Sequence, residues 1–496
     1  MDTYQYVLLG LQVGLQPINL LMCFVGVLIG TLVGVLPGLG PVAAMALLLP
    51  ITFHLTPTTA IIMLSGIYYG AMYGGSTTSI LVNIPGEAAS VITCLDGYQM
   101  ARKGRAGPAL GMAAFGSFIA GTVGIAILML IATPLSTVVL RFGPPQYCSL
   151  MVLGMTLLIY LAQDSKIKAV VMACFGLILG FIGIDVLTGQ PRFNFGWMEL
   201  ADGVGVVPLI MGVFGIAEVL VNIEDMTAQE VYETKIRGLL PTPSDWADSK
   251  WPIARGTVIG FFLGLLPGGG PIIASFSSYA IEKRLSKHPE KFGTGIIEGV
   301  AGPESANNSA TASGYVPLFI IGIPTNGVMA MLFSALLIHG LQPGPLLLKD
   351  HPEIFWGTVM SMYLGNVMLL VLNLPLIGLW VKILKIPYQI LFPLIISFCL
   401  IGAYSINNSV IDVVVMLIFG VVGYLMRKFG YEGAPLILAF VLGPLLERAF
   451  IQSLNMSAGS YSIFFTEPVS AVTLTIAFIL VLLSAISVFR KTTSGG

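Results

Sequence analysis

The sequence predicts an all-α protein that crosses a membrane many times, with two inverted-topology repeats whose broken, re-entrant helices meet near the bilayer midplane. Of the 496 residues, 56% are hydrophobic and 9% are charged, whereas a soluble domain has about 25% charged residues. Apolar runs long enough to span a membrane recur along the chain, as in 168–186 and 469–489. Motifs rich in proline and glycine interrupt such runs and occur twice. We expect roughly 10–14 membrane elements.

Several classes of protein are disfavoured. An outer-membrane barrel would show strands of alternating hydrophobicity instead of long apolar runs. The net charge of −1 gives no indication of nucleic-acid binding. The four histidines form no HExxH motif and no Gly-Lys pair forms a phosphate-binding loop, so neither a metalloprotease nor an ATPase is expected. The five cysteines are scattered and show no metal-ligand spacing. The start of the chain has no basic n-region, so we expect no cleavable signal peptide.

The first part of the chain, residues 1–222, reads as the first membrane repeat. Its apolar or helical segments are, in order, 18–36, 42–53, 88–100, 107–131, 146–162, 168–187 and 204–222. The first span ends at GVLPGLGP, residues 34–41, which we call the first break. A segment of small and polar residues, 68–79, runs into Asn83-Ile84-Pro85-Gly86-Glu87, which we call the first tip. Residues 101–105 then form a basic loop.

A polar connector, 223–251, separates this part from the second membrane repeat, 252–496. The second repeat contains a stretch of unusual polarity, 298–326, with Pro303 inside it. Polar groups and non-helical backbone at membrane depth are tolerated where they are buried in protein or line a cavity, so this stretch is expected to form half of a binding site. The C-terminal part adds spans at 353–376, 386–405, 408–426, 433–447 and 469–489.

Three landmarks indicate an internal duplication. Each recurs in the same order at an offset of 230 to 239 residues: 34–41 with 264–271, 84–86 with 323–325, and 107–108 with 344–345. We call 264–271 the second break and 322–326 the second tip.

The charges of equivalent loops indicate that the two copies are inverted. The basic loop 101–105 corresponds to 339–343, which has no Lys or Arg, and the basic loop 282–291 corresponds to 51–57, which also has none. Positive residues favour the cytoplasmic side of a membrane. Equivalent loops that exchange their charge therefore predict copies of opposite topology, as in many secondary transporters.

The breaks and tips contain the residues that we expect to bind the substrate and a coupling ion. A half-helix that begins after Pro85 or Pro324 exposes free backbone N–H groups at its positive end, and two such ends can hold an anion without Lys or Arg. The expected substrate-binding residues are Ser76, Thr77, Asn83, Pro85, Gly86, Asn307, Asn308, Pro324, Thr325 and Asn326. Oxygen ligands and carbonyls released at the breaks suit an alkali cation. The expected ligands of a coupling ion are Gly38, Gly40, Ser79, Glu87, Gly268, Gly270, Glu304 and Ser309.

Each of these assignments has a structural alternative. The glycines can serve close helix packing, and Ser and Thr can bond back to their own helices. Glu304 can act as a helix cap at an aqueous interface, and Glu87 can stabilise the first turn of a half-helix. The Asn307-Asn308 pair favours function more strongly, because two amides are costly in lipid.

The motifs resemble those of a known family. The run YYGAMYGGSTTSILVNIPGEAASVITCLDGYQMARKGRAGPAL and the second-copy segment from LPGGGPIIASFSSYAIEKRL to GYVPLFIIGIPTNGVMA resemble the large membrane subunit of the tripartite tricarboxylate transporters, TctA-like proteins. The similarity extends over essentially the whole chain, and the family's signature positions fall on most of the candidates at the breaks and tips.

The resemblance implies a carrier in the bacterial inner membrane that works with a small membrane subunit and a periplasmic solute-binding protein. It implies di- or tricarboxylate substrates, such as citrate, uptake driven by Na⁺ or H⁺, and no cofactor beyond that cation. The Arg and Lys residues at 427–428 and 490–491 predict a cytoplasmic C-terminus. An autonomous ion/carboxylate symporter and an anion channel remain as alternatives. Of the metals, only Na⁺ is expected.

Overall fold

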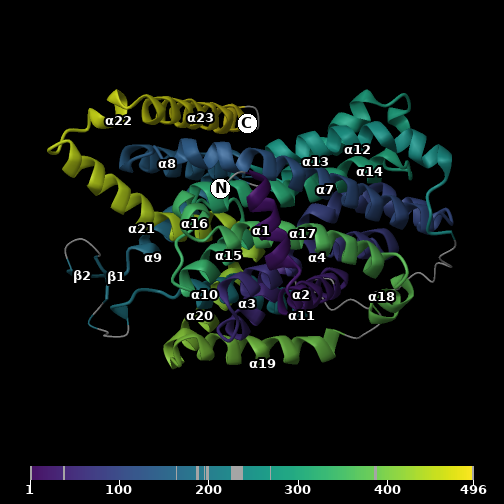
Figure 1. Cartoon of the computed structure of the whole chain (residues 1–496), viewed down its shortest axis with the longest axis horizontal. Helices are drawn as coiled ribbons and strands as arrows, with labels where there is room; N and C mark the ends of the chain where they lie inside the picture. Colours follow the sequence, from purple (N-terminus) through teal and green to yellow (C-terminus); the bar gives the residue numbers. More distant parts are fainter. Residues whose placement is uncertain are drawn as a thin grey trace.

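The computed structural model describes residues 3–36, 40–162, 165–185, 189–194, 196, 200–224, 238–268, 270–384 and 388–493. These residues are almost entirely helical, apart from the small antiparallel hairpin of β1 (Gly183–Ile184) and β2 (Pro191–Arg192) (Figure 1). Seven described helices are long and apolar enough to cross a membrane: Pro17–Val35, Ala106–Val139, Val206–Glu224, Pro352–Asn373, Val410–Lys428, Gly433–Met456 and Pro468–Ile486. Three apolar helices are shorter: Gly40–Thr52, Gly327–Ile338 and Phe392–Asn407. The prediction of an all-α, multi-pass membrane protein is confirmed.

The first copy is built on two helices that cross closely, α2 (Pro17–Val35) and α4 (Pro57–Val82), with α3 (Gly40–Thr52) between them in sequence. Proline at the first position and the Thr56 cap favour the start of α4. Every fourth residue of α2 at the crossing is glycine, which lets the two backbones touch. A Cβ atom on Gly26, Gly30 or Gly34 would lie 2.2, 2.4 or 2.3 Å from the carbonyl oxygens of Met63, Ile67 and Ala71. The residue numbers of the contacting pairs increase along both helices, so α2 and α4 run parallel.

The second copy repeats this crossing with α12 (Pro243–Gly264) and α14 (Glu298–Ser313), and α13 (Gly270–Leu285) lies between them in sequence. Here a Cβ atom on Gly256, Gly260 or Gly264 would lie 2.3, 2.2 or 2.4 Å from the carbonyl oxygens of Gly302, Ala306 and Ala310. The glycines of α12 lie 230 residues after those of α2, the same offset as the two breaks. The duplicated sequence motifs therefore coincide with a duplicated helix crossing. Pro303 does not interrupt α14.

Each crossing pair is followed by a tip and a half-helix. After the first tip, the chain continues through η1 (Ala88–Ser90), α5 (Val91–Thr93), η2 (Cys94–Tyr98) and α6 (Gln99–Arg102). After the second tip it continues into α15 (Gly327–Ile338), with the π-helical turn η6 (Pro317–Ile321) preceding the tip. The first half-helix packs against α13 and α14 of the second copy, and α15 packs against α3 and α4 of the first. Each copy thus holds the half-helix of the other.

Helices α4 and α14 lie against each other and run in opposite directions. Ser76 of α4 contacts Glu304 of α14. Two turns earlier in α4, the Tyr68 hydroxyl lies next to Thr311, about two turns later in α14. Because α2 runs with α4 and α12 runs with α14, the two crossing pairs are antiparallel to each other.

Other helices pack against the two crossing pairs. Helix α7 (Ala106–Val139) packs along α14, and α17 (Pro352–Asn373) packs against α1, α2 and α4. The C-terminal helix lies beside α8 at the top of the view (Figure 1). The other helices are α1 (Thr3–Gly14), α8 (Pro144–Tyr160), α9 (Lys166–Gly180), α10 (Val206–Ile210), η4 (Met211–Ile216), α11 (Ala217–Glu224), η5 (Pro289–Lys291), α16 (Pro345–Asp350), α18 (Ile377–Ile383), α19 (Tyr388–Asn407), α20 (Val410–Lys428), α21 (Gly433–Met456), α22 (Ile463–Thr466) and α23 (Pro468–Thr493).

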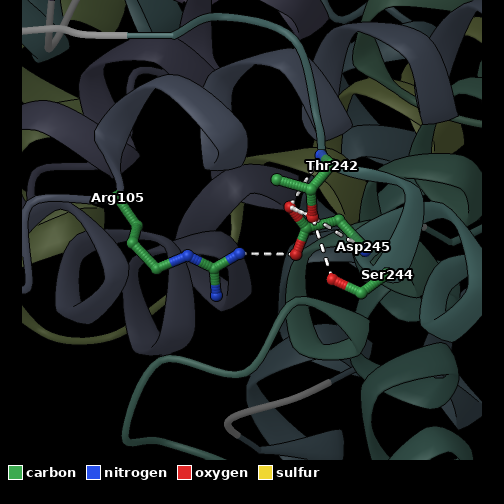
Figure 2. Close-up of polar contacts among 4 residues, drawn as sticks. All are labelled: Arg105, Thr242, Ser244 and Asp245. Atoms are coloured by element: carbon green, nitrogen blue, oxygen red, sulfur yellow. Dashed lines mark hydrogen bonds and ion pairs between the residues drawn. The ribbon is translucent and has the colours of Figure 1, made fainter.

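One end of the molecule carries the two basic loops, and ionic contacts tie the copies together there. The Arg105 guanidinium donates to Asp245, the third residue of α12 (Figure 2). Thr242 and Asp245 form a capping box, in which Asp245 Oδ2 accepts from the Thr242 N–H at 3.0 Å. The Lys103 ammonium donates to the Thr294 carbonyl at 2.5 Å. The last part of the expected connector, from residue 238, belongs to the described residues and leads into α12, while its residues 225–237 lie outside the described part.

Candidate ion and substrate site

Glu304 of α14 is buried in the protein interior and is 1% exposed. Three hydroxyls from three other elements donate to its carboxylate: Ser76 of α4 at 2.6 Å, Thr93 of α5, and Ser117 of α7 at 3.4 Å. None of the ion pairs among the described residues involves Glu304. The carboxylate is therefore held by neutral donors alone, although burying an uncompensated charge is costly.

A small cavity of about 10 Å³ is lined by two of the residues that donate to this carboxylate, Ser76 and Ser117. Its walls include the hydroxyl-bearing residues Ser76, Thr77 and Ser117, and also Asn373 at the end of α17. The Asn373 side chain donates to the Leu369 carbonyl at 2.9 Å, but its buried Oδ1 atom has no hydrogen-bond partner. The cavity is close to the size needed for one water molecule. Its lining is rich in oxygen atoms, which hard cations prefer.

A second buried carboxylate, Glu87, belongs to the first tip. It caps the first half-helix, because its Oε2 atom accepts the Ala89 N–H at 2.6 Å. Its Oε1 atom accepts from Asn307 Nδ2 at 3.4 Å, while the buried Oδ1 atom of Asn307 has no partner. Asn307 follows Glu304 by about one turn of α14. This helix therefore carries one buried carboxylate, Glu304, and donates a hydrogen bond to the other, Glu87.

Asn308 completes the network around Glu304. Its Nδ2 atom donates to the Ser117 hydroxyl at 2.6 Å and to the Glu304 carbonyl at 3.1 Å. Both asparagines of the pair are therefore buried in the polar cluster, where amides can offset their desolvation.

The second tip has an equivalent arrangement with a neutral cap. Asn326, which corresponds to Glu87, accepts the Met329 N–H at 3.0 Å and donates to the Tyr68 hydroxyl at 3.1 Å. Thr325 is fully buried, and its hydroxyl has no hydrogen-bond partner. The Thr325 carbonyl accepts the Gly268 N–H at 2.9 Å. Gly268 has φ +116°, which a residue with a Cβ rarely adopts, so the second break needs glycine to reach the tip.

The first tip is fixed by close packing. A Cβ atom on Gly86 would lie 1.9 Å from the Gly34 carbonyl oxygen. The Thr78 hydroxyl donates to the Val35 carbonyl at 2.9 Å, so a carbonyl at the end of α2 is already bonded. Gly40 begins α3 with φ +60°. Gly38 lies outside the described residues.

Some expected site residues lie elsewhere. Asn83 is exposed and ends α4 in the left-handed conformation, which asparagine tolerates. The Ser309 hydroxyl donates to the Thr257 carbonyl of α12 at 2.7 Å, and the Ser79 hydroxyl donates to the Gly75 carbonyl at 2.9 Å. Gly270 packs against Gly264. The prolines of the two tips, Pro85 and Pro324, precede the capping residues of the half-helices.

Sequence reasoning missed Thr93, Ser117, Tyr68 and Asn373. None of them lies in a motif with proline at a break, and only the tertiary packing brings their polar atoms to the tips and to Glu304. Within the described part of the chain, no group of three His, Cys, Asp or Glu side chains could hold a metal ion. The oxygen atoms of the cluster come from carboxylates, hydroxyls and amides.

A multi-pass bundle of broken helices that buries carboxylates, hydroxyls and amides is typical of membrane transport proteins and not of enzymes. Residues 20–438 match the family described as the Tripartite tricarboxylate transporter TctA family, and the chain belongs to this family.

Two relatives come from Agrobacterium vitis. The uncharacterized 52.8 kDa protein in the TAR-I ttuC' 3'region is 51% identical over 491 residues, which cover 99% of this chain and 98% of that protein. The uncharacterized protein in the TAR-II ttuC' 3'region is 49% identical over 232 residues, which cover 47% of this chain and 96% of that protein. No solved structure matches the chain.

Proposed function

We propose that this chain is the carrier subunit that imports di- or tricarboxylates, such as citrate, by cation-coupled alternating access. A small membrane subunit would accompany it, and a periplasmic solute-binding protein would deliver the substrate. The observation that carries the proposal is the buried Glu304 carboxylate, which has only hydroxyl donors. Two of these donors line a small cavity together with Asn373, whose amide oxygen is unpaired.

The coupling cation would bind at Glu304. A buried carboxylate is costly unless a proton or a cation neutralises it. The hydroxyls of Ser76 and Ser117 now donate to the carboxylate, and each can rotate to offer a lone pair to a cation instead. Together with Asn373 Oδ1, they would give a set of oxygen ligands suited to Na⁺. Protonation of Glu304 would serve H⁺ coupling at the same position.

The substrate would bind where the two tips meet helices α4 and α14. The N-terminal ends of the half-helices attract an anion. Their first N–H groups are partly satisfied by Glu87 and Asn326, so substrate binding would compete with these caps or use the next free N–H groups. The unpaired Thr325 hydroxyl and the Asn307 amide are further groups for contacting a carboxylate or the cation that accompanies it.

Opposite topology of the two copies would place these sites at the midplane. The antiparallel packing of α4 and α14, the parallel pairs α2/α4 and α12/α14, and the exchanged half-helices support this proposal. So do the loop charges, which predict a cytoplasmic side for loops 101–105 and 282–291. The same rule predicts a cytoplasmic C-terminus, and the family supports a location in the bacterial inner membrane. The repeats would span 1–222 and 252–496.

Reconstitution tests the proposed function. The chain and its small membrane subunit would be placed in proteoliposomes, with or without the solute-binding protein, under an imposed Na⁺ or H⁺ gradient. We expect labelled citrate or succinate to accumulate when the binding protein and one of the gradients are present. Accumulation by the chain alone would favour an autonomous symporter. Flux that follows the anion gradient and never accumulates would contradict the proposal and favour a channel.

A further inference from the structure

A second, larger cavity of about 320 Å³ lies beside the second tip. Ile321 and Gly322, which lead into that tip, form part of its wall, and so do Pro343 and Gly344 of the following loop. Gly322 has φ +83°, and a Cβ atom there would lie 2.6 Å from the Pro343 carbonyl oxygen. The cavity wall therefore continues directly into the second tip. A molecule in the cavity would contact residues that precede Thr325 by only a few positions in the chain.

The charge of the lining is unbalanced. Arg448 of α21 is the single charged residue among the residues that line the cavity, and its side chain is exposed. The preceding residue, Glu447, is bound by Arg192 through two contacts of 2.6 and 3.0 Å. Arg448 itself takes part in none of the ion pairs of the described residues. The lining also contains the amides of Gln342 and Gln452. The cavity therefore offers a positive charge and amide donors.

The cavity lies at the end of the molecule away from the basic loops. Helix α7 begins after Arg105 at the basic end, and a helix of 34 residues extends about 50 Å. Phe142 and Gly143, just beyond the other end of α7, line the cavity. With the basic loops on the cytoplasmic side, the cavity would face the periplasm.

We propose that this cavity is an outward-facing vestibule in which a small carboxylate anion is held by Arg448 before it reaches the second tip. The inference rests on the proposed function for the direction of transport. The size of the cavity suits a small di- or tricarboxylate, and the Arg448 guanidinium matches the geometry of a carboxylate. Arg448 would raise the local concentration of the anion and thereby lower the KM for uptake.

Charge-selective labelling tests the vestibule without knowledge of the natural substrate. Gln452→Cys would be made in the full chain with the five native cysteines replaced, and labelled on intact cells with an anionic or a cationic methanethiosulfonate reagent. Ser460→Cys, in the exposed loop after α21, is the control position. We expect the ratio of anionic to cationic labelling rates to be about fivefold higher at position 452 than at the control. Arg448→Gln should remove this difference, and Arg448→Lys should retain most of it.

Two outcomes would overturn the vestibule. One is a labelling ratio at position 452 that equals the control or does not respond to Arg448→Gln. The other is labelling that occurs only from the cytoplasmic side, in inside-out vesicles. Citrate and succinate are the probes for occupancy: slower labelling at 452 in their presence, but not in choline chloride of equal ionic strength, would support carboxylate binding, and the absence of any protection would contradict it.

An uptake measurement separates this inference from the proposed function. Arg448→Gln should raise the KM for citrate or succinate about tenfold with kcat nearly unchanged. Arg141→Gln, which removes another exposed arginine near the same end, should leave KM unchanged. Concentrative uptake with an unaltered KM in Arg448→Gln would overturn the vestibule and keep the proposed function. An Arg448-dependent labelling ratio with carboxylate protection, in a protein that never accumulates a carboxylate, would keep the vestibule and contradict the proposed function.

Discussion

Two buried carboxylates, Asp96 and Glu304, show how different donors give a carboxylate different roles. Asp96 is fully buried in the first half-helix, and Glu304 is 1% exposed in α14. Asp96 accepts backbone N–H groups from Gly293, Gly295 and Ile296 at 3.0, 2.7 and 3.0 Å. The Tyr279 hydroxyl also donates to it at 2.8 Å. Glu304, in contrast, is bonded by side-chain hydroxyls alone.

The type of donor determines whether a carboxylate can exchange its hydrogen-bond donors for a cation. A backbone N–H can only donate and its direction is fixed, so Asp96 holds the loop between α13 and α14 onto the first half-helix. A hydroxyl can donate or accept. In the proposed mechanism the donors of Glu304 turn toward a cation, and the cavity lined by Ser76 and Ser117 gives the cation room. Burial of a carboxylate alone does not indicate a transport role; our proposal rests instead on adaptable donors and an unpaired neighbouring oxygen.

The largest expected effect is that of Glu304→Gln. The amide cannot carry a negative charge, so it can neither bind a proton nor balance a cation. We expect the initial rate of gradient-driven citrate or succinate uptake to fall at least about 100-fold in proteoliposomes, as for other losses of an essential charged group. The amount of folded protein in the membrane should be similar to that of the wild type. Near-normal uptake would show that Glu304, like Asp96, is structural.

Asp96→Asn is the opposite test. An amide has one acceptor oxygen and brings its own N–H groups toward the donors of the loop, so at least one buried N–H loses its partner. We expect the free energy of unfolding to fall by about 3 kcal/mol, measured by thermal or denaturant unfolding in detergent. Uptake per folded molecule should stay within about twofold. Selective loss of uptake by a stable Asp96→Asn protein would remove the distinction between the two carboxylates.

Asn373→Ala sharpens the assignment of the cation site. The change removes the unpaired oxygen from the small cavity but leaves every donor to Glu304 in place. We expect the cation concentration for half-maximal uptake to rise about tenfold, corresponding to the loss of one ligand of about 1.4 kcal/mol. Asn366→Ala, about two turns earlier in α17, is a poor control because the Tyr73 hydroxyl donates to Asn366. The exposed Val371→Ala on the same helix is the matched control and should have no effect on cation dependence.

The smallest expected effect concerns the contact between the copies at the basic end (Figure 2). Burial raises the pKa of the Asp245 carboxyl, but hydrogen bonds from the Thr242 N–H and the Arg105 guanidinium outweigh this and lower the pKa below its ordinary value. A lowered pKa in the folded state stabilises the protein above the unfolded pKa of about 4, and the contribution disappears as the pH falls through the folded-state value. We expect Arg105→Gln to cost about 1 kcal/mol or less at pH 7.

The pH dependence of that variant is the check. The difference in stability between Arg105→Gln and the wild type should shrink as the pH is lowered from about 7 toward 3, because Asp245 then becomes neutral. An equal difference at both ends of this range would assign the effect of Arg105 to packing of its side chain instead of to its charge.

The sequence alone allowed the membrane class, the breaks and tips, and the internal duplication to be predicted, because proline, glycine and hydropathy act locally. Glu304 and the Asn307-Asn308 pair stood out because polar groups are rare in apolar chains. Ser117 and Asn373 did not, since each lies in an ordinary apolar helix and reaches the site only through packing that no local pattern encodes.

The same limit applies to residues whose motif suggested a site. Asn83 lies next to the first tip in sequence, but its backbone requirement is the end of α4, and its side chain is exposed. Ser309 is buried and follows Asn308 in the sequence, but its position on the helix directs its hydroxyl to α12. Neighbourhood in the chain indicated where polar residues gather, while the direction of each side chain depends on the helix crossing.

Whether Glu304 couples the cation gradient to transport is tested by comparing accumulation with exchange in proteoliposomes that contain wild-type protein or Glu304→Gln. Under the gradient that drives the wild type, labelled citrate or succinate should accumulate above its external concentration with the wild type. Glu304→Gln should exchange the label across the membrane without accumulating it, because the substrate site remains and the coupling group is lost. Accumulation by Glu304→Gln to the level of the wild type would contradict the account and place the coupling cation elsewhere.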